Sequence, residues 1–220
     1  MIHHLAGRIG PAAVIAAGLL LASGVARAQS TQAAKDGKKL VRAGDAAQQA
    51  VSELTVHVRE VVDDYNAIVY GSTKKPESSY KRLSSHRAGV DRKIQAAMQS
   101  VEDMNARAAQ YFTDWEAELE RYTSASVRDK SAARLESTKQ RYATIAESLA
   151  EAREAFVPLL GSLDDQLLFL GRDLSPGAVA DLGDEALELN RRAEDVFVTV
   201  DDLMARVEGV EAPADVVSAD

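Results

Sequence analysis

A seven-residue repeat of apolar side chains runs through most of this chain and limits what it can fold into. Between Tyr80 and Trp115 apolar or small residues return at alternating steps of three and four, and only Arg87 interrupts them. This spacing places one continuous stripe on a single helix face. The stripe comprises Tyr80, Leu83, Val90, Ile94, Ala97, Val101, Met104, Ala108, Tyr111 and Trp115. The pattern favours long helices packed side by side.

The same repeat recurs in three other segments, which predicts helices over about residues 47–70, 77–123, 127–172 and 176–208. The turns between them are short, so consecutive helices should be antiparallel. We therefore expect an all-α fold: an elongated antiparallel four-helix bundle or coiled coil in up-down-up-down order. Residues 47–209 would form this single domain. A helix of about 45 residues would be about 70 Å long, which predicts a rod.

Turn and breaker residues predict where these helices begin and end. Gly71 should end the first helix, Ser126 should cap the third, and Ser175-Pro176 should begin the last. Pro158 lies inside the third helix and should kink it. After Pro158 this helix is apolar over more than one stripe, which predicts that other helices surround it.

The first 28 residues have the three parts of a secretory signal peptide. Arg8 gives the basic region, residues 12–22 the apolar region, and Ala26-Arg27-Ala28 the small-x-small cleavage site. We expect cleavage between Ala28 and Gln29, and hence a periplasmic protein with no transmembrane segment after cleavage. An uncleaved N-terminal anchor is the alternative. The chain of 220 residues contains no cysteine, so its stability cannot depend on disulfide bonds.

Charge and composition describe the two ends of the expected mature chain. Residues 29–46 are basic and contain two glycines, so we expect a segment that frays. Residues 210–220 contain Pro213 and no repeat, which predicts a disordered tail. The whole chain has a net charge of −8, with an excess of acidic residues in the last helix. Because phosphates must be neutralised by Lys and Arg, we do not expect nucleic-acid binding.

The segment around the second turn resembles a known bacterial family. The resemblance is carried by Trp115, Arg141-Tyr142, Phe156-Val157-Pro158-Leu159-Leu160, Asp165-Gln166 and Leu174. These residues are similar to domain of unknown function 2959, and the likeness extends from about Tyr80 to Val207. The resemblance implies an exported helical protein without assigned activity, so it implies no catalytic residue. Many members carry a lipoprotein signal, but a chain without cysteine lacks the lipid attachment point.

The sequence offers little that resembles an active site, and we predict no catalytic, cofactor-binding or metal-binding residue. A di-iron bundle needs Glu-x-x-His on two helices, whereas the expected mature chain has only His57 and His86. The paired carboxylates at 63–64, 164–165 and 201–202 point in different directions on a helix. They are typical of a solvated face, with weak cation binding to the acidic last helix as the alternative.

Two other groups of residues have both a structural and a functional interpretation. Trp115 and the nearby tyrosines are expected to form a packing layer, with an exposed aromatic platform as the alternative. The basic residues at the first turn are expected to be solvated, although they could bind an anionic envelope surface. They are Lys74, Lys75, Lys81, Arg82, Arg87, Arg92 and Lys93.

The sequence is therefore most typical of a protein that is not an enzyme. We expect a structural or protein-interaction component of the bacterial cell envelope, which binds an envelope protein or itself through helix faces. The alternative is a periplasmic chaperone-like protein that shields unfolded clients. A metalloenzyme is a third hypothesis, which the ligand spacing disfavours.

Overall fold

The computed structural model describes residues 32–71 and 73–209, and within them it contains helices and no strand. The all-α prediction is confirmed. The helices are α1 (Gln32–Val69), α2 (Pro76–Leu119), α3 (Ala125–Arg172), α4 (Pro176–Asp181) and α5 (Gly183–Gly209). The predicted signal peptide and C-terminal tail lie outside the described residues.

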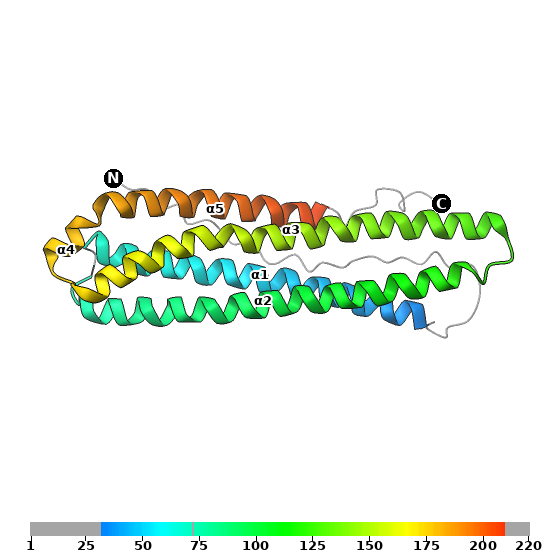
Figure 1. Ribbon diagram of the computed structural model, residues 1–220, viewed down its shortest axis with the longest axis horizontal. Helices are drawn as coiled ribbons and strands as arrows, with labels where there is room; N and C mark the ends of the chain where they lie inside the picture. The colour runs from blue at the N-terminus through cyan, green and yellow to red at the C-terminus, as the bar shows by residue number, and fades with distance from the viewer. Residues whose placement is uncertain (1–31, 72, 210–220) are drawn as a thin grey trace, which may run out of the picture.

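The long helices lie side by side along one axis (Figure 1). α1 and α2 form the first hairpin and pack against each other along their length. α3 returns beside α2, the short α4 lies at the end of the rod, and α5 runs back along α3. The polar and apolar faces described below are set by this lengthwise packing.

The first helix is longer than predicted. α1 begins at Gln32, so most of the segment 29–46 is helical rather than frayed. Leu40 and Ala43 are buried in the core, and Gly44 lies against Met104 of α2. A glycine weakens an isolated helix by about 1 kcal/mol. Here packing against α2 outweighs that cost, so the residues before Val51 belong to the folded unit.

The helix ends follow local chemistry, with two corrections. Gly71 has φ of +68°, the left-handed conformation that ends a helix, as predicted. The cap of α3 is Ser124 rather than Ser126: Ser124 Oγ accepts a hydrogen bond from the Val127 amide at 3.5 Å. Ser175 caps α4 as predicted, by accepting from the Ala178 amide at 3.3 Å. The predicted last helix is interrupted at Leu182, which separates α4 from α5.

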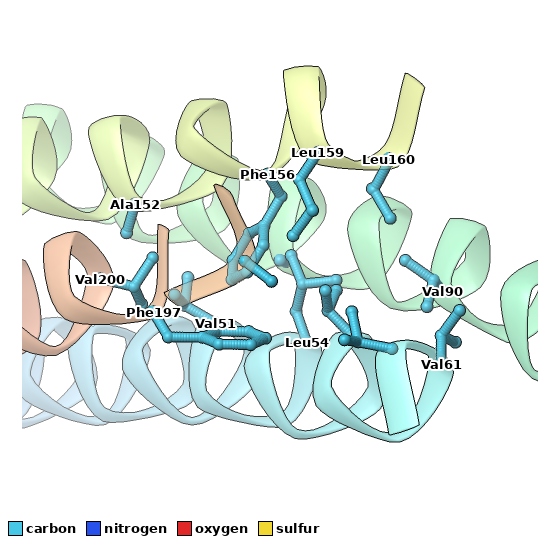
Figure 2. Close-up of a cluster of buried hydrophobic side chains, with 14 of the residues drawn as sticks. Val51, Leu54, Val61, Val90, Ala152, Phe156, Leu159, Leu160, Phe197 and Val200 are labelled. Carbon is cyan, nitrogen blue, oxygen red and sulfur yellow. The ribbon is translucent and has the colours of Figure 1, made fainter. Parts of the chain in front are cut away.

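The core is continuous along the rod and is made by the apolar stripes of all the long helices. Figure 2 shows part of it, where Leu54, Phe156 and Phe197 come from α1, α3 and α5. The rings of Phe156 and Phe197 are tilted, with centroids 6.5 Å apart. Because each stripe is buried by its neighbours, the heptad pattern accounts for most of the buried apolar surface.

The C-terminal part of α3 is less enclosed by other helices than its sequence predicts. The helix continues through Pro158 to Arg172, and its yellow end in Figure 1 runs obliquely to the rest. Leu163, Leu167 and Leu170 are buried, but the side chain of Leu168 is 78% exposed and that of Phe169 is 43% exposed. The prediction that other helices surround this segment is wrong: α1, α2 and α5 cover one side of it, and the side that carries Leu168 and Phe169 is exposed.

The two ends of the rod differ in the number of helices. α5 ends at Gly209, shortly after Arg206, whose Nη2 lies 4.0 Å from Glu151 Oε2 of α3. Among the described residues, α2 and α3 continue from there to the turn between them, and α1 accompanies them over part of that distance (Figure 1). We call the space beside α1 and α3 beyond the end of α5 the open position. It is flanked by residues 32–48 of α1 and residues 125–146 of α3.

Candidate functional site

Arg87, which interrupts the apolar stripe of α2, forms the most extensive ion-pair contact between α2 and α3. Its Nε and Nη2 donate to the two carboxylate oxygens of Asp164, each at 2.7 Å, and Nη1 donates to Asp91 at 2.6 Å. The Arg87 side chain is only 15% exposed. Burial lowers its pKa, but the hydrogen bonds to Asp164 and Asp91 raise it by more. Because a bidentate pair has one geometry, this contact fixes the register of α2 on α3.

Asp64 forms a second ion-pair contact, between α1 and α2. It is buried, and its Oδ1 accepts from Arg82 Nε at 2.8 Å. Its Oδ2 lies 2.7 Å from His86 Nδ1 but makes no hydrogen bond of good geometry within the described residues. Burial, and then repulsion from Asp64, raise the pKa of the neighbouring Asp63. The paired carboxylates therefore face different surroundings and do not form a chelate.

The basic residues at the first turn do not form one surface. Arg82 and Arg87 are engaged by the carboxylates just described, and Lys93 Nζ donates to Glu53 of α1 at 2.8 Å. Lys74, Lys75 and Lys81 are exposed and have no ion pair within the described part of the chain. Arg92 is also exposed, and its Nη1 donates to the Ala88 carbonyl of its own helix at 3.4 Å. These solvated side chains form a weaker site for an anionic surface than the sequence suggested, because Arg82, Arg87 and Lys93 are engaged by carboxylates.

A set of neutral polar contacts ties α1 to α3 and α5, and the sequence did not reveal it. The Tyr65 hydroxyl donates to Gln166 Oε1, and burial raises the pKa of Tyr65. Gln166 Nε2 in turn donates to the Glu185 carbonyl at 3.5 Å. Asn66 and Asn190 exchange two amide hydrogen bonds of 2.7 and 2.8 Å. Tyr65 and Asn66 of α1 are each more than 100 residues from their partners along the chain. Only the axial register of the folded helices therefore brings these side chains together.

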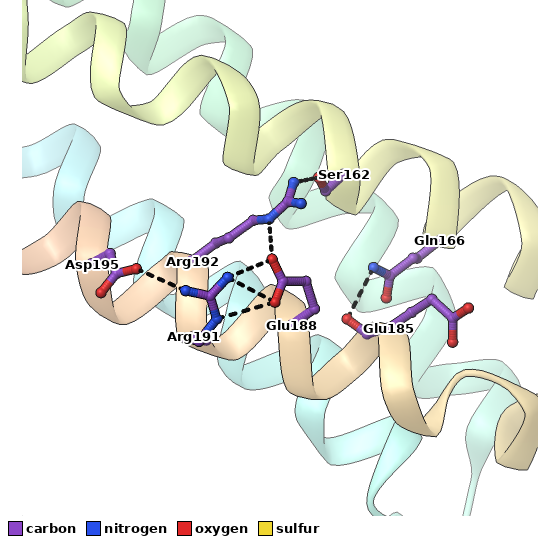
Figure 3. A network of polar contacts seen from close by, with 7 residues as sticks. All are labelled: Ser162, Gln166, Glu185, Glu188, Arg191, Arg192 and Asp195. Carbon is purple, nitrogen blue, oxygen red and sulfur yellow. Dashed lines mark hydrogen bonds and ion pairs between the residues drawn. The ribbon is translucent and has the colours of Figure 1, made fainter.

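A shallow acidic groove lies between α3 and α5 near α4. It is lined by Ser162, Asp165, Gln166, Asp184, Glu185, Glu188, Leu189 and Arg192. Figure 3 shows that Glu188 is held by Arg192 and Arg191, and that Arg192 Nη1 donates to Ser162 of α3 at 2.9 Å. The hydrogen bonds from Arg192 and then Arg191 lower the pKa of Glu188. Because Arg191 and Arg192 neutralise Glu188, the central carboxylate of the groove, the groove is unlike a cation site.

No group of three potential ligands that could hold a metal ion occurs in residues 32–71 and 73–209. His57 Nδ1 lies 2.9 Å from the Glu53 carbonyl of its own helix. The predicted pair at 201–202 is also divided, because Asp201 Oδ2 accepts from Arg59 of α1 at 3.4 Å. The residues that sequence analysis considered as ligands are thus placed apart.

The aromatic residues at the second turn form a packing layer between α2 and α3. Trp115 meets Tyr111 edge to face, with ring centroids 5.7 Å apart, and its Nε1 donates to Ser131 at 2.9 Å. Phe112 makes a similar contact with Tyr142, whose hydroxyl donates to Asn105 at 2.7 Å. Burial raises the pKa of Tyr142 to about 12. Trp115 and Tyr142 bond across the hairpin, which favours the packing interpretation over an exposed platform.

The described residues thus define an all-α protein of long packed helices, and none of these helices is long and apolar enough to cross a membrane. Comparison with known families gives a more specific assignment. The chain matches the model of the family described as "Protein of unknown function (DUF2959)" over residues 30–212, and it belongs to that family. Neither a curated protein nor a solved structure shows a significant match to the chain.

Proposed function

We propose that this protein is an exported, non-catalytic component of the bacterial cell envelope that acts by binding other proteins through helix faces. Its architecture in this proposal is an elongated antiparallel four-helix bundle in up-down-up-down order. The signal peptide would be cleaved after Ala28, which would release the bundle into the periplasm. The three-part pattern of the first 28 residues supports the export step.

The open position carries this proposal. In the half that contains α5, charged groups of neighbouring helices pair with one another, as Arg87 does with Asp164 and Arg59 with Asp201. The three-helix half instead exposes Arg134 and Arg141 of α3, which have no ion pair within the described residues. A rod that satisfies its own contacts over one half and leaves a side uncovered in the other is suited to receive a partner.

Site-specific crosslinking in the envelope tests the proposal. A photoreactive amino acid at position 141 should capture a protein of the envelope, either this chain or another one. The matched control is position 107 on α2, where Arg107 is also exposed and has no ion pair within the described residues. Fractionation with mass spectrometry would establish the compartment and the mature N-terminus. If position 141 captures no more than position 107, or the chain stays cytoplasmic, the proposal is wrong.

One observation favours a chaperone-like function as the second candidate. Val157 and Leu168 of α3 are 60% and 78% exposed, and the exposed Pro158 and Gly161 lie between them. Asp164 lies on the same face between them and is paired with Arg87. Exposed apolar side chains of this kind can bind apolar segments of unfolded clients. Aggregation of a model client should then be suppressed by the wild-type protein and much less by Val157→Lys/Leu168→Lys. No suppression at molar excess would end this alternative.

A further inference from the structure

The open position continues the place of α5 along the rod. Ser162 of α3 faces α5, because Arg192 donates to its hydroxyl at 2.9 Å. Residues seven apart keep the same face in helices that pack lengthwise. Going from Ser162 toward the second turn, this position is occupied by Ala155, Ser148, Arg141 and Arg134. The residues are small where α5 covers them, and they become arginine where α5 has ended.

The opposite wall of the open position comes from α1. Arg59 and Asn66 face α5, since they bond to Asp201 and Asn190. The same seven-residue step leads through Ser52 and Asp45 to Lys38. The wall residues 32–48 contain four basic and two acidic residues, and residues 125–146 of α3 contain five basic and two acidic residues. At the positions that the seven-residue step identifies, the walls carry Lys38, Arg134 and Arg141 and one acidic residue, Asp45, so their surface is cationic.

The outer face of α5 has the opposite charge. α5 contains eight acidic and three basic residues. Leu187 and Val198 are 63% and 56% exposed on the face turned away from the core. Glu194 and Asp202 lie on the same side of the helix, four residues to either side of Val198, and neither has an ion pair within the described residues. This face is acidic with apolar side chains between the charges, which matches the open position in chemistry.

Shape and charge together make this side of the molecule complementary to itself. Along one side of the rod α5 projects over the half near α4, and within residues 32–71 and 73–209 no helix continues it over the other half (Figure 1). A two-fold rotation about an axis perpendicular to the rod places the projecting half of one copy over the open half of the other. Both contacts are then the same, as an isologous dimer requires.

We propose that the partner at the open position is a second copy of this chain, and that each copy's α5 fills the open position of the other. The inference rests on the proposed function and makes its partner specific. The open position is about 20 residues long, so each contact strip is about 30 Å by 10 Å. Two strips bury on the order of 1,200 Å² over both partners, which is the lower end of specific interfaces.

Reciprocal charge reversal tests the proposal in the chain from Gln29 to Asp220, by light scattering coupled to size exclusion. The wild-type protein should be a dimer at micromolar concentration. Arg134→Glu/Arg141→Glu should weaken it about a hundredfold or more, because like charges then face each other in both strips. Glu194→Lys/Asp202→Lys should do the same. Mixing the two variants should restore a dimer, since both strips then pair opposite charges.

Matched controls separate the position from the charge. Arg107→Glu/Arg121→Glu makes the same change in net charge at exposed arginines outside the open position, and it should leave the dimer intact. Helical circular dichroism confirms that each variant is folded. A strictly monomeric wild-type protein would overturn the inference, and so would a dimer that survives both reversals or a mixture that stays monomeric. If position 141 still captures another envelope protein, the proposed function stands with a different partner.

Discussion

Arg87 offers a test of how an ion pair inside an apolar stripe acts on stability. The Arg87 side chain is 15% exposed, whereas the Asp164 side chain is 50% exposed. Removing Asp164 and removing Arg87 should therefore have unequal effects. Asp164→Ala leaves a half-enclosed cation with Asp91 as its remaining carboxylate partner. Arg87→Leu leaves a carboxylate that water can reach, and it completes the apolar stripe between Leu83 and Val90.

The structure sets the size of these effects. Breaking a fully buried pair costs about 3–5 kcal/mol, and breaking an exposed pair costs about 0–1 kcal/mol. The Arg87–Asp164 pair lies between these limits, so Asp164→Ala should lower the free energy of unfolding by about 2 kcal/mol. Arg87→Leu should stay within about 1 kcal/mol of the wild type, since apolar replacement of such pairs is often neutral. The double variant should resemble Arg87→Leu.

Urea unfolding followed by circular dichroism measures all four members of this cycle. Asp91→Ala is the control: it removes only an exposed contact four residues away on the same helix, which is worth about 0.5 kcal/mol or less. If Arg87→Leu costs more than Asp164→Ala, the pair stabilises the fold rather than fixing register, and the reasoning is refuted. The reasoning would also be refuted if the effects of Arg87→Leu and Asp164→Ala on the free energy of unfolding were additive in the double variant.

Three further predictions concern single positions. Gly161→Ala should raise the free energy of unfolding by about 1 kcal/mol, because no other atom lies near the position of the added Cβ. Gly171→Ala should not raise it, because the added Cβ would meet the Tyr80 side chain. That contact would break the 3.1 Å hydrogen bond from the Tyr80 hydroxyl to the Leu167 carbonyl. Equal urea midpoints for the two variants would contradict this. Gly71→Ala should lower stability by about 1 kcal/mol, since φ is +68° there, and a neutral effect in the same assay would argue against that turn. Ultraviolet titration should show one tyrosine with a pKa near 12 that Tyr142→Phe removes. Because burial raises this pKa above the usual value of about 10, the associated stability is complete below pH 10 and is lost as the pH rises through 12.

The regular parts of the fold followed from the sequence because their causes are local. The heptad stripe, Gly71 and Ser175-Pro176 act within a few residues of themselves, and each appears in the structure where the pattern predicted it. The start of α1 did not follow, because the packing of Leu40 and Ala43 on α2 outweighs the glycines nearby. The export signal and the envelope function stay predictions.

The polar contacts could not be predicted from the sequence for a different reason. Tyr65 and Gln166 are 101 residues apart, so their contact depends on the axial register of two helices. Arg87 was visible as an interruption of the stripe, but its carboxylate partner could not be chosen among the many on α3. The open position depends on where α5 stops relative to α3, which is a difference in length that no local pattern reports.

The unequal thickness of the rod has a mechanical consequence. Resistance to bending rises steeply with cross-section, so the half that contains α5 should be stiff and the half that ends at the second turn should be compliant. A load applied at the second turn would then be taken up by flexing near the level of Gly209, before the half that contains α5 is disturbed. A second molecule that covers the open position would even out this difference and turn two half-flexible rods into one rigid strut.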